Sequence, residues 1–220
     1  TGNIQGIKPF SNDPKDKNRY DWVTPIMISK QSPNRVYLGG NRLFISNNGG
    51  VSWDRTKDLT KAINRDSLKI MDVLGVDTKI SRNDGTSSYG EIISMDESPL
   101  WYKILWVGTD DGNVQVTKNN GKNWENVKLN IKEVPKKIWV SRVEASKHVK
   151  GRAYVTFDNH RFDDNSPYVY VTEDYGKRWK NITSNLPKDY SVYVIKEDPI
   201  NPNLLFIGTE ESVYFSYDRG

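Results

Sequence analysis

The octet Thr172-Glu-Asp-Tyr-Gly176-Lys-Arg-Trp179 decides the fold, because the chain repeats it. Its pattern is Ser/Thr-x-Asp/Asn-x-Gly-x-x-Trp. The other copies are Ser46-Asn-Asn-Gly-Gly50-Val-Ser-Trp53, Thr117-Lys-Asn-Asn-Gly121-Lys-Asn-Trp124 and the shortened Ser216-Tyr-Asp-Arg-Gly220. One such octet can arise by chance, but four copies in register with the same flanking patterns indicate a repeat protein.

Short apolar stretches precede each octet at matching distances. The two nearest in each unit are Val36–Gly39 with Leu43–Ser46, Leu105–Gly108 with Val114–Thr117, Ala153–Thr156 with Tyr168–Thr172, and Leu205–Gly208 with Val213–Ser216. A third lies further upstream, at Pro25–Ser29, Ile92–Met95, Val140–Glu144 and Val192–Lys196. A weaker, more polar strand follows each complete octet. Four short strands rich in Val, Ile, Tyr, Trp and Phe are typical of one β-propeller blade.

The repeat therefore predicts an all-β fold of four-stranded antiparallel blades. We expect residues 1–220 to form part of a single β-propeller, with blades at about 22–60, 90–130, 138–184 and 190–220 and a long connection over 61–89. Three complete units and a shortened fourth are too few to close a ring, because every blade buries its faces against neighbours. The sequence thus predicts an incomplete fragment, whose partners include the remaining blades and whose fourth octet would place a Trp three positions after Gly220.

The residues of the octets are expected to be structural. The Asp or Asn accepts hydrogen bonds from backbone N–H groups of the turn, the Gly adopts a positive φ angle, and the Trp packs against the blade. The residues assigned to this scaffold role are Ser46, Asn48, Gly50, Trp53, Thr117, Asn119, Gly121, Trp124, Thr172, Asp174, Gly176, Trp179, Ser216, Asp218 and Gly220.

The octets resemble the Asp-box, or BNR, repeats of sialidases, bacterial xyloglucanase-like propellers and sortilin-type receptors. Longer stretches, such as Tyr37-Leu-Gly-Gly-Asn41-Arg-Leu-Phe44 and Trp106-Val-Gly-Thr-Asp-Asp-Gly-Asn-Val114, are similar to large exported bacterial proteins labelled glycosyl hydrolase-like or sortilin-like. The resemblance implies the propeller fold and an extracytoplasmic location: secreted, periplasmic or at the cell surface. It implies an activity only loosely, since one fold carries many functions.

Composition excludes several classes of protein. The chain has 32 basic and 28 acidic residues, interspersed along it, so no basic block for nucleic acid is present. The absence of cysteine excludes disulfides, thiol catalysis and Cys-ligated zinc. No run of eighteen apolar residues would span a bilayer, so no transmembrane segment is expected in this chain.

Irregular spacing between the octets points to one rim of the propeller. The extra residues lie in Asp54–Gly90 and Asp158–Ser166, both on the rim opposite the octets, which we call the loop face. Inserted loops on a rigid scaffold are common binding sites. This face is expected to display Asp110, Asp111, Asp158, Asn159, His160, Arg161, Asp163, Asp164, Glu210 and Glu211, with Arg82, Asp84 and Tyr89 from the long connection. The ligand-binding candidates among them are Asp110, Asp111, Asp158, His160, Arg161, Asp163 and Asp164.

Three interpretations of the carboxylates on this face are open. Two of them would serve as acid and base in glycoside hydrolysis, or several would bind calcium. The simpler alternative is that Asp110 and Asp111 shape tight turns. An ion pair from Arg161 to Asp163 or Asp164 would order the inserted loop.

No catalytic residue is assigned from the sequence. His148 and His160 are the only histidines and are expected on opposite rims, so no metal site is predicted and no cofactor beyond a possible calcium ion. No set of residues matches the arginine cluster and Tyr–Glu pair that a sialidase requires. Trp101, Tyr102 and Trp139 would stack on sugar rings, but aromatic residues bordering blade strands are more often part of the core.

Three functions remain open. The favoured one is a non-catalytic module that binds a protein or polysaccharide at the cell exterior. The alternative is a sialidase-type or xyloglucanase-type glycoside hydrolase, with its two carboxylates partly supplied by other blades. A purely structural part of a larger exported assembly is the third.

Overall fold

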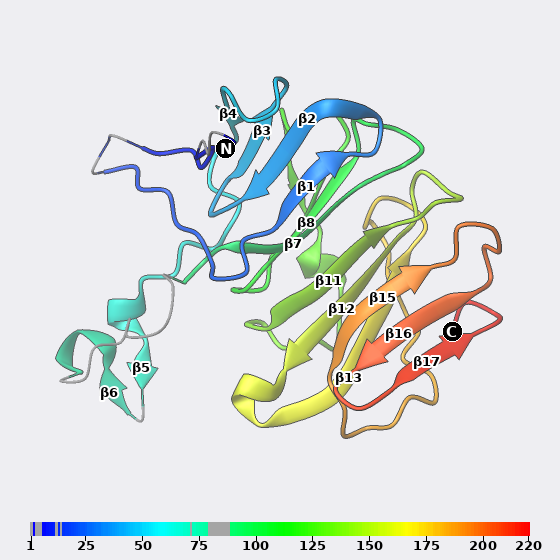
Figure 1. Cartoon of the computed structure of the whole chain (residues 1–220). Coiled ribbons are helices and arrows are strands. Elements are labelled where there is room, and N and C mark those ends of the chain that lie inside the picture. Colours follow the sequence, from blue (N-terminus) through cyan, green and yellow to red (C-terminus); the bar gives the residue numbers. More distant parts are fainter. Residues whose placement is uncertain (1, 3–5, 12, 14, 71, 79–88) are drawn as a thin grey trace.

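The computed structural model describes residues 2, 6–11, 13, 15–70, 72–78 and 89–220. Four antiparallel sheets follow one another along the chain, and Figure 1 shows them side by side, from the blue β1–β4 sheet to the orange and red β15–β17 sheet. The expected all-β fold of four-stranded antiparallel blades is confirmed, with strands neighbouring one another in sequence order in every sheet. We number the sheets blades 1 to 4.

The strands of the blades are short. Blade 1 contains β1 (Ile26–Ser29), β2 (Ser32–Gly39), β3 (Leu43–Ser46) and β4 (Asp54–Arg55). Blade 2 contains β7 (Ile92–Glu97), β8 (Leu105–Thr109), β9 (Val114–Thr117) and β10 (Glu125–Asn126). Blade 3 contains β11 (Trp139–Ala145), β12 (Ala153–Asn159), β13 (Asp164–Thr172) and β14 (Lys180–Asn181). Blade 4 has three described strands, β15 (Val192–Glu197), β16 (Leu205–Thr209) and β17 (Val213–Ser216).

The long connection after blade 1 has its own small elements. They are the 3-10 helix η1 (Arg65–Ser67), the hairpin strands β5 (Lys69–Ile70) and β6 (Val73–Leu74), and the 3-10 helix η2 (Gly75–Asp77). The hairpin stands apart from the blades in Figure 1. Arg82 and Asp84, which were expected on the loop face, lie outside the described residues. Two further 3-10 helices, η3 (Lys128–Asn130) and η4 (His160–Phe162), lie in loops of blades 2 and 3.

The hydrophobic core consists of three clusters, one between each pair of adjacent blades. A strand turns alternate side chains to its two faces, so each blade packs against both neighbours. One aromatic residue of the second strand is fully buried at each interface: Tyr37, Trp106 and Tyr154. Trp179 from the octet of blade 3 packs edge-on against Trp106, with ring centroids 6.2 Å apart.

The octets form the same hydrogen-bonded turn in every blade. In blade 3 the Thr172 hydroxyl accepts the Gly176 N–H at 2.9 Å and donates to Asp174 Oδ1 at 3.0 Å. Asp174 Oδ1 in turn accepts the Arg178 N–H at 2.9 Å. The hydroxyl of the first octet residue makes both contacts in the other three turns as well. The turns are Ser46 with Asn48 and Gly50; Thr117 with Asn119 and Gly121; and Ser216 with Asp218 and Gly220. All four glycines have positive φ angles, and an Asn carbonyl oxygen replaces the Asp oxygen without loss of the turn.

A buried glutamate joins blades 1 and 2. Glu97, at the end of β7, is fully buried and accepts the Ser29 hydroxyl at 2.9 Å, the Lys30 N–H at 2.6 Å and the Tyr37 hydroxyl at 2.8 Å. All three donors belong to blade 1. Burial, followed by the Glu97 carboxylate, raises the pKa of the Tyr37 phenol, which therefore stays protonated as a donor.

Blades 3 and 4 are joined in the same way. Glu197 of β15 accepts the Ser146 hydroxyl at 2.9 Å, the Lys147 N–H and the Tyr154 hydroxyl at 2.9 Å. We call each of these arrangements a glutamate clasp. A buried carboxylate is tolerated only when its lone pairs are satisfied, and each clasp supplies at least three donors.

The interface between blades 2 and 3 has no glutamate clasp. Ala145 pairs with Ala153 as Glu97 pairs with Leu105, so Ala145 holds the position of the glutamate. Trp106, which has no hydroxyl, holds the position of Tyr37. The chain therefore uses two kinds of blade interface, one with Tyr and Glu and one with Trp and Ala.

The N-terminal segment covers the turn of blade 1. The Trp53 indole N–H donates to the Ile7 carbonyl at 2.8 Å, and a Cβ atom on Gly50 would lie 3.1 Å from the Ile7 side chain. In the interface between blades 2 and 3, Val127 lies against Gly176 in the same way. Ile7 thus lies against Gly50 as Val127 lies against Gly176. Val127 directly follows β10, the outer strand of the blade before Gly176.

Candidate functional site

The loop between β12 and β13 is organised by one buried carboxylate. Asp158 is 3% exposed and accepts His160 Nδ1 at 2.7 Å, the His160 N–H at 3.1 Å and Arg161 Nη1 at 3.3 Å. Asp163, in the left-handed conformation at φ 59°, ends η4. Asp158 was expected on the surface, but it turns inward because its loop donates these three hydrogen bonds to it.

Asp164 closes the other end of this loop. It accepts Asn159 Nδ2 at 2.8 Å, the Ser166 N–H at 3.0 Å and the Tyr168 hydroxyl at 2.8 Å. Partial burial raises the pKa of Asp164, but these hydrogen bonds outweigh it and hold the pKa below its ordinary value. The ion pair expected from Arg161 to Asp163 or Asp164 is replaced by the pair with Asp158.

Aromatic and cationic side chains gather beside this loop. The Arg161 guanidinium lies 4.0 Å from the centroid of the Trp139 ring, and the rings of His160 and Tyr193 meet edge to face at 6.5 Å. Phe162 is 66% exposed. We call these five residues, Trp139, His160, Arg161, Phe162 and Tyr193, the aromatic–cationic patch. Trp139 was expected in the core, but it is half-buried at the rim because β11 begins with it.

Asp110 and Asp111 are buried instead of displayed. Asp110 is 6% exposed and accepts the Glu91 N–H at 2.7 Å and the Gly90 N–H at 3.1 Å. Asp111 is fully buried and accepts the Lys61 N–H at 2.6 Å and the Thr109 hydroxyl at 2.6 Å. Both carboxylates therefore fasten the two ends of the long connection to blade 2. Of the remaining expected residues, Asn159 is also buried, whereas Asp163, Glu210 and Glu211 are exposed and Tyr89 is half-buried.

Glu91 is a buried acid that the sequence did not single out. It is fully buried, and neither carboxylate oxygen has a hydrogen-bond partner among the described residues. Burial, followed by the charge of Asp110, raises the pKa of Glu91 to about 9. Burial also raises the pKa of Asp110. The raised pKa favours the protonated, neutral form of Glu91 at pH 7. It has no exposed surface, so it cannot reach a substrate.

Replacing Glu91 by glutamine should raise stability increasingly as the pH rises. The folded pKa is about 9 and the ordinary value is 4.5, so the native state retains a proton that the unfolded chain releases. Wild-type stability therefore falls between about pH 4.5 and 9, by at most roughly 1.4 kcal/mol per pH unit, and Glu91→Gln removes this slope. Urea unfolding at pH 5, 7 and 9 measures it. Glu125→Gln, at an exposed position, is the control, and parallel curves for wild type and Glu91→Gln would contradict the assignment.

The described residues hold no group of three or more His, Cys, Asp or Glu side chains arranged to bind a metal ion. His148 lies on the octet rim, away from His160, and its Nε2 is 2.8 Å from the Asp198 carbonyl. In the described part of the chain, no helix has the length and apolar character needed to cross a membrane.

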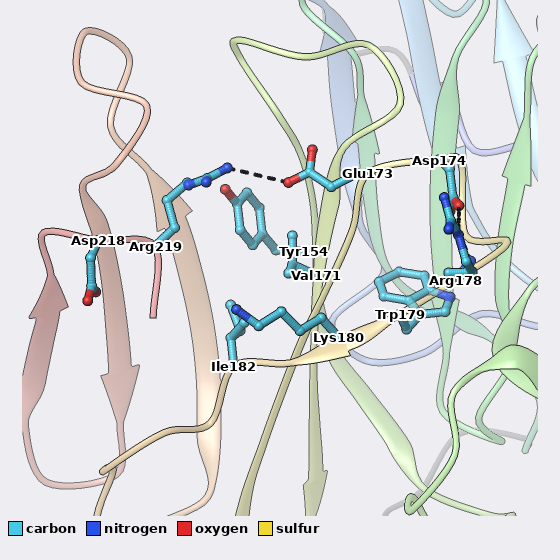
Figure 2. A pocket seen from close by; sticks show the side chains of 10 residues that line it. All are labelled: Tyr154, Val171, Glu173, Asp174, Arg178, Trp179, Lys180, Ile182, Asp218 and Arg219. Carbon is cyan, nitrogen blue, oxygen red and sulfur yellow. Dashed lines mark hydrogen bonds and ion pairs between the residues drawn. The ribbon is translucent and has the colours of Figure 1, made fainter.

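A cavity of about 350 Å³ lies between blades 3 and 4 on the octet side. Figure 2 shows Arg219 reaching from blade 4 toward Glu173 of blade 3, while Arg178 pairs with Asp174 at the opposite wall. Tyr154, at the position of Trp106, also lines it. The lining mixes both signs of charge, and its Asp174 and Glu173 each pair with an arginine.

Solved structures share this fold. No family model and no curated protein matches the sequence. An ancestral GH74 enzyme has a TM-score of 0.63 at 17% identity, over 94% of this chain and 24% of its own. The GH74 xyloglucanase from Xanthomonas campestris has a TM-score of 0.57 at 16% identity, over 86% of this chain and 27% of its own. A chain of the COPII outer coat vertex on membranes has 0.53 at 12%, over 94% and 47%. The chain spans less than half the length of these structures, and at such identities the likeness shows the β-propeller fold alone.

Proposed function

We propose that this chain is part of an Asp-box β-propeller that works outside the cytoplasm and binds a polysaccharide or protein partner through its aromatic–cationic patch. The observation that carries the proposal is the contrast on the loop face. Its buried carboxylates accept hydrogen bonds from other groups of the protein, whereas Arg161, Phe162 and Tyr193 present a positive charge and aromatic ring surface to solvent.

The chemistry of the patch suits binding. Aromatic rings pack against sugar rings and apolar side chains, and guanidinium and imidazole groups donate hydrogen bonds at the edges. The Arg161 side chain is 48% exposed although it also contacts Trp139 and Asp158. These contacts hold the guanidinium in place, which lowers the entropy lost when a ligand binds.

Hydrolysis is supported less well by the same residues. A glycoside hydrolase needs two carboxyl groups facing one cleft, one of them protonated near neutral pH. Asp110, Asp111 and Asp158 are buried and hydrogen-bonded, and the protonated Glu91 has no surface. The GH74 likeness therefore bears on this chain's fold, and the binding function fits its own side chains better.

The Arg161→Ala/Tyr193→Ala double variant should lose affinity for the ligand by about tenfold or more, as expected for one aromatic and one cationic contact. Affinity electrophoresis in gels containing xyloglucan, mixed-linkage β-glucan or a sialylated glycan measures it. A photo-crosslinking amino acid at position 193 tests for a protein partner. Tyr217, 71% exposed on the octet rim, supplies the matched controls, Tyr217→Ala and the same crosslinker at 217.

Two outcomes would sink the proposal. One is release of reducing ends from any of these glycans that Asp158→Asn abolishes without changing the circular dichroism spectrum, which would favour the hydrolase. The other is ligand binding or crosslinking that is equal at positions 193 and 217.

A further inference from the structure

The face of blade 4 that is turned away from blade 3, which we call its outer face, carries apolar side chains. In the other blades the next blade covers this face. Phe206 is 39% exposed, Val213 72% and Phe215 60%. Strand pairing identifies their counterparts, because Phe206 pairs with Phe215 as Tyr37 pairs with Ile45 and Trp106 with Val116. The counterparts of Phe206 are Tyr37, Trp106 and Tyr154, and those of Val213 are Leu43, Val114 and Val169. All six are at most 1% exposed. An incoming sheet covers every one of them.

In blades 1 and 2 a glycine in the second strand marks where the first strand of the next blade lies, whereas blade 3 has Thr156 at this position. A Cβ atom on Gly39 would meet the Ile92 side chain at 3.1 Å, and one on Gly108 would meet Val140 at 2.4 Å. Ile92 and Val140 belong to the innermost strands of the following blades. Gly208 has the same position in β16, yet its only near neighbour is Val194 of its own blade. Blade 4 therefore has the same glycine that blades 1 and 2 have where the next blade approaches closely.

The side chains around this face decide which kind of interface it forms. Both glutamate clasps need a tyrosine hydroxyl from the second strand and a serine hydroxyl from the C-terminal end of the first strand or the residue after it. Blade 4 has Phe206 at the tyrosine position and Asp198 at the position of Ser29 and Ser146. Asp198 accepts the Ile200 and Asn201 N–H groups and donates nothing. A glutamate placed here would lack both hydroxyl donors and face a second carboxylate.

We propose that the outer face of blade 4 receives a further blade of this repeat, which carries an aliphatic residue and not glutamate at the position of Glu197. The interface is of the kind formed by Trp106 and Ala145. Blade 1 offers the matching chemistry on its own free face, because Ile28 holds the glutamate position there and is 63% exposed.

An extended chain tests the proposal. The turn at Gly220 has the conformation of the turn at Gly176, so a second copy of residues 177–220 can be appended to Gly220 to supply an outer strand and a further blade. This copy is made in two forms, one with its own glutamate and one with Glu197→Ala in the appended copy only. The chain has no cysteine, so Val213→Cys in the original blade 4 gives a single thiol whose maleimide labelling rate reports coverage of the face.

The appended blade with alanine should slow labelling of Cys at position 213 at least tenfold relative to the unextended chain, whereas the blade with glutamate should leave it nearly unchanged. The reciprocal control is Phe206→Tyr/Asp198→Ser in blade 4, which restores the clasp donors and should reverse the preference. Equal protection by both forms on the unaltered face would overturn the choice of residue. Full labelling with all four combinations would overturn the docking of a further blade.

Discussion

Replacing Glu97 by alanine should lower the free energy of unfolding by about 3–5 kcal/mol, because it leaves buried donors without an acceptor. Ser29 and Tyr37 are 6% and 0% exposed, and water cannot reach their hydroxyls as the blades stand. Chemical denaturation monitored by tryptophan fluorescence measures the loss. Tyr37→Phe, which removes one of the three donors and keeps the carboxylate satisfied by the others, should cost only about 1 kcal/mol.

A second substitution separates the clasp from simple packing. The Glu97→Ala/Tyr37→Trp variant copies the Ala145 and Trp106 pair that already joins blades 2 and 3. It should be more stable than Glu97→Ala alone, since one buried hydroxyl is removed and its space is filled. If the double variant were less stable by the sum of the two separate losses, the two kinds of interface would not be interchangeable.

Replacing Gly176 by alanine should cost roughly 3 kcal/mol. Its φ angle of 83° is in the left-handed region, which disfavours a side chain by about 1–2 kcal/mol, and a new Cβ atom would lie 2.7 Å from Val127 Cβ. Overpacking against an atom so close to the backbone adds a further roughly 1–3 kcal/mol. The melting temperature and urea midpoint measure the loss.

Gly49→Ala is the matched control for this glycine. Gly49 also has a positive φ angle, 69°, but nothing lies within 4 Å of a Cβ atom built on it. Its substitution should therefore cost only about 1–2 kcal/mol, the conformational part. Equal losses at the two positions would mean that Val127 yields to the new methyl group, and that the blade 2–3 contact is looser than its distances indicate.

The repeat made much of the fold predictable. Ser/Thr, Asp/Asn and Gly act within one turn, and their hydrogen bonds span at most four residues, so sequence spacing alone locates them. Strand pairs of the blades are likewise close in sequence. That is why the expected strands, such as Leu205–Gly208 and Val213–Ser216, lie within or overlap the observed β16 and β17.

The loop face was harder to predict because its carboxylates bind distant backbone groups. Asp111 accepts the N–H of Lys61, fifty residues earlier, and Asp110 accepts that of Gly90. An aspartate after a strand looks the same in sequence whether such a donor is present or not. Sequence propensities therefore suggested that the Asp110 and Asp111 side chains are exposed. They are buried because the two ends of the long connection donate hydrogen bonds to them.

The glutamate clasps left a signal that spacing could have revealed. Ser-Lys stands at the end of the first strand in blade 1 and directly after it in blade 3, and a tyrosine lies in the second strand of the same two blades. Blades 2 and 4 have glutamate at the end of the first strand instead. This alternation identifies the two interfaces that have a clasp. The interface between blades 2 and 3 is the exception, because blade 2 supplies Trp106 and blade 3 supplies Ala145 at the same positions.

The most direct test of the account compares an octet variant with a patch variant in one pair of measurements. Asp174→Ala removes the acceptor for Thr172 and Arg178, and Arg161→Ala removes an exposed cation from the aromatic–cationic patch. For the ligand identified by electrophoresis or crosslinking, we expect Asp174→Ala to lower the unfolding midpoint while the folded protein keeps its affinity. We expect Arg161→Ala to lose affinity while it remains folded, although the loss of its contacts with the buried Asp158 and with Trp139 lowers its midpoint as well. Loss of affinity in folded Asp174→Ala, with Arg161→Ala binding normally, would contradict the assignment of structure to the octet rim and binding to the loop face.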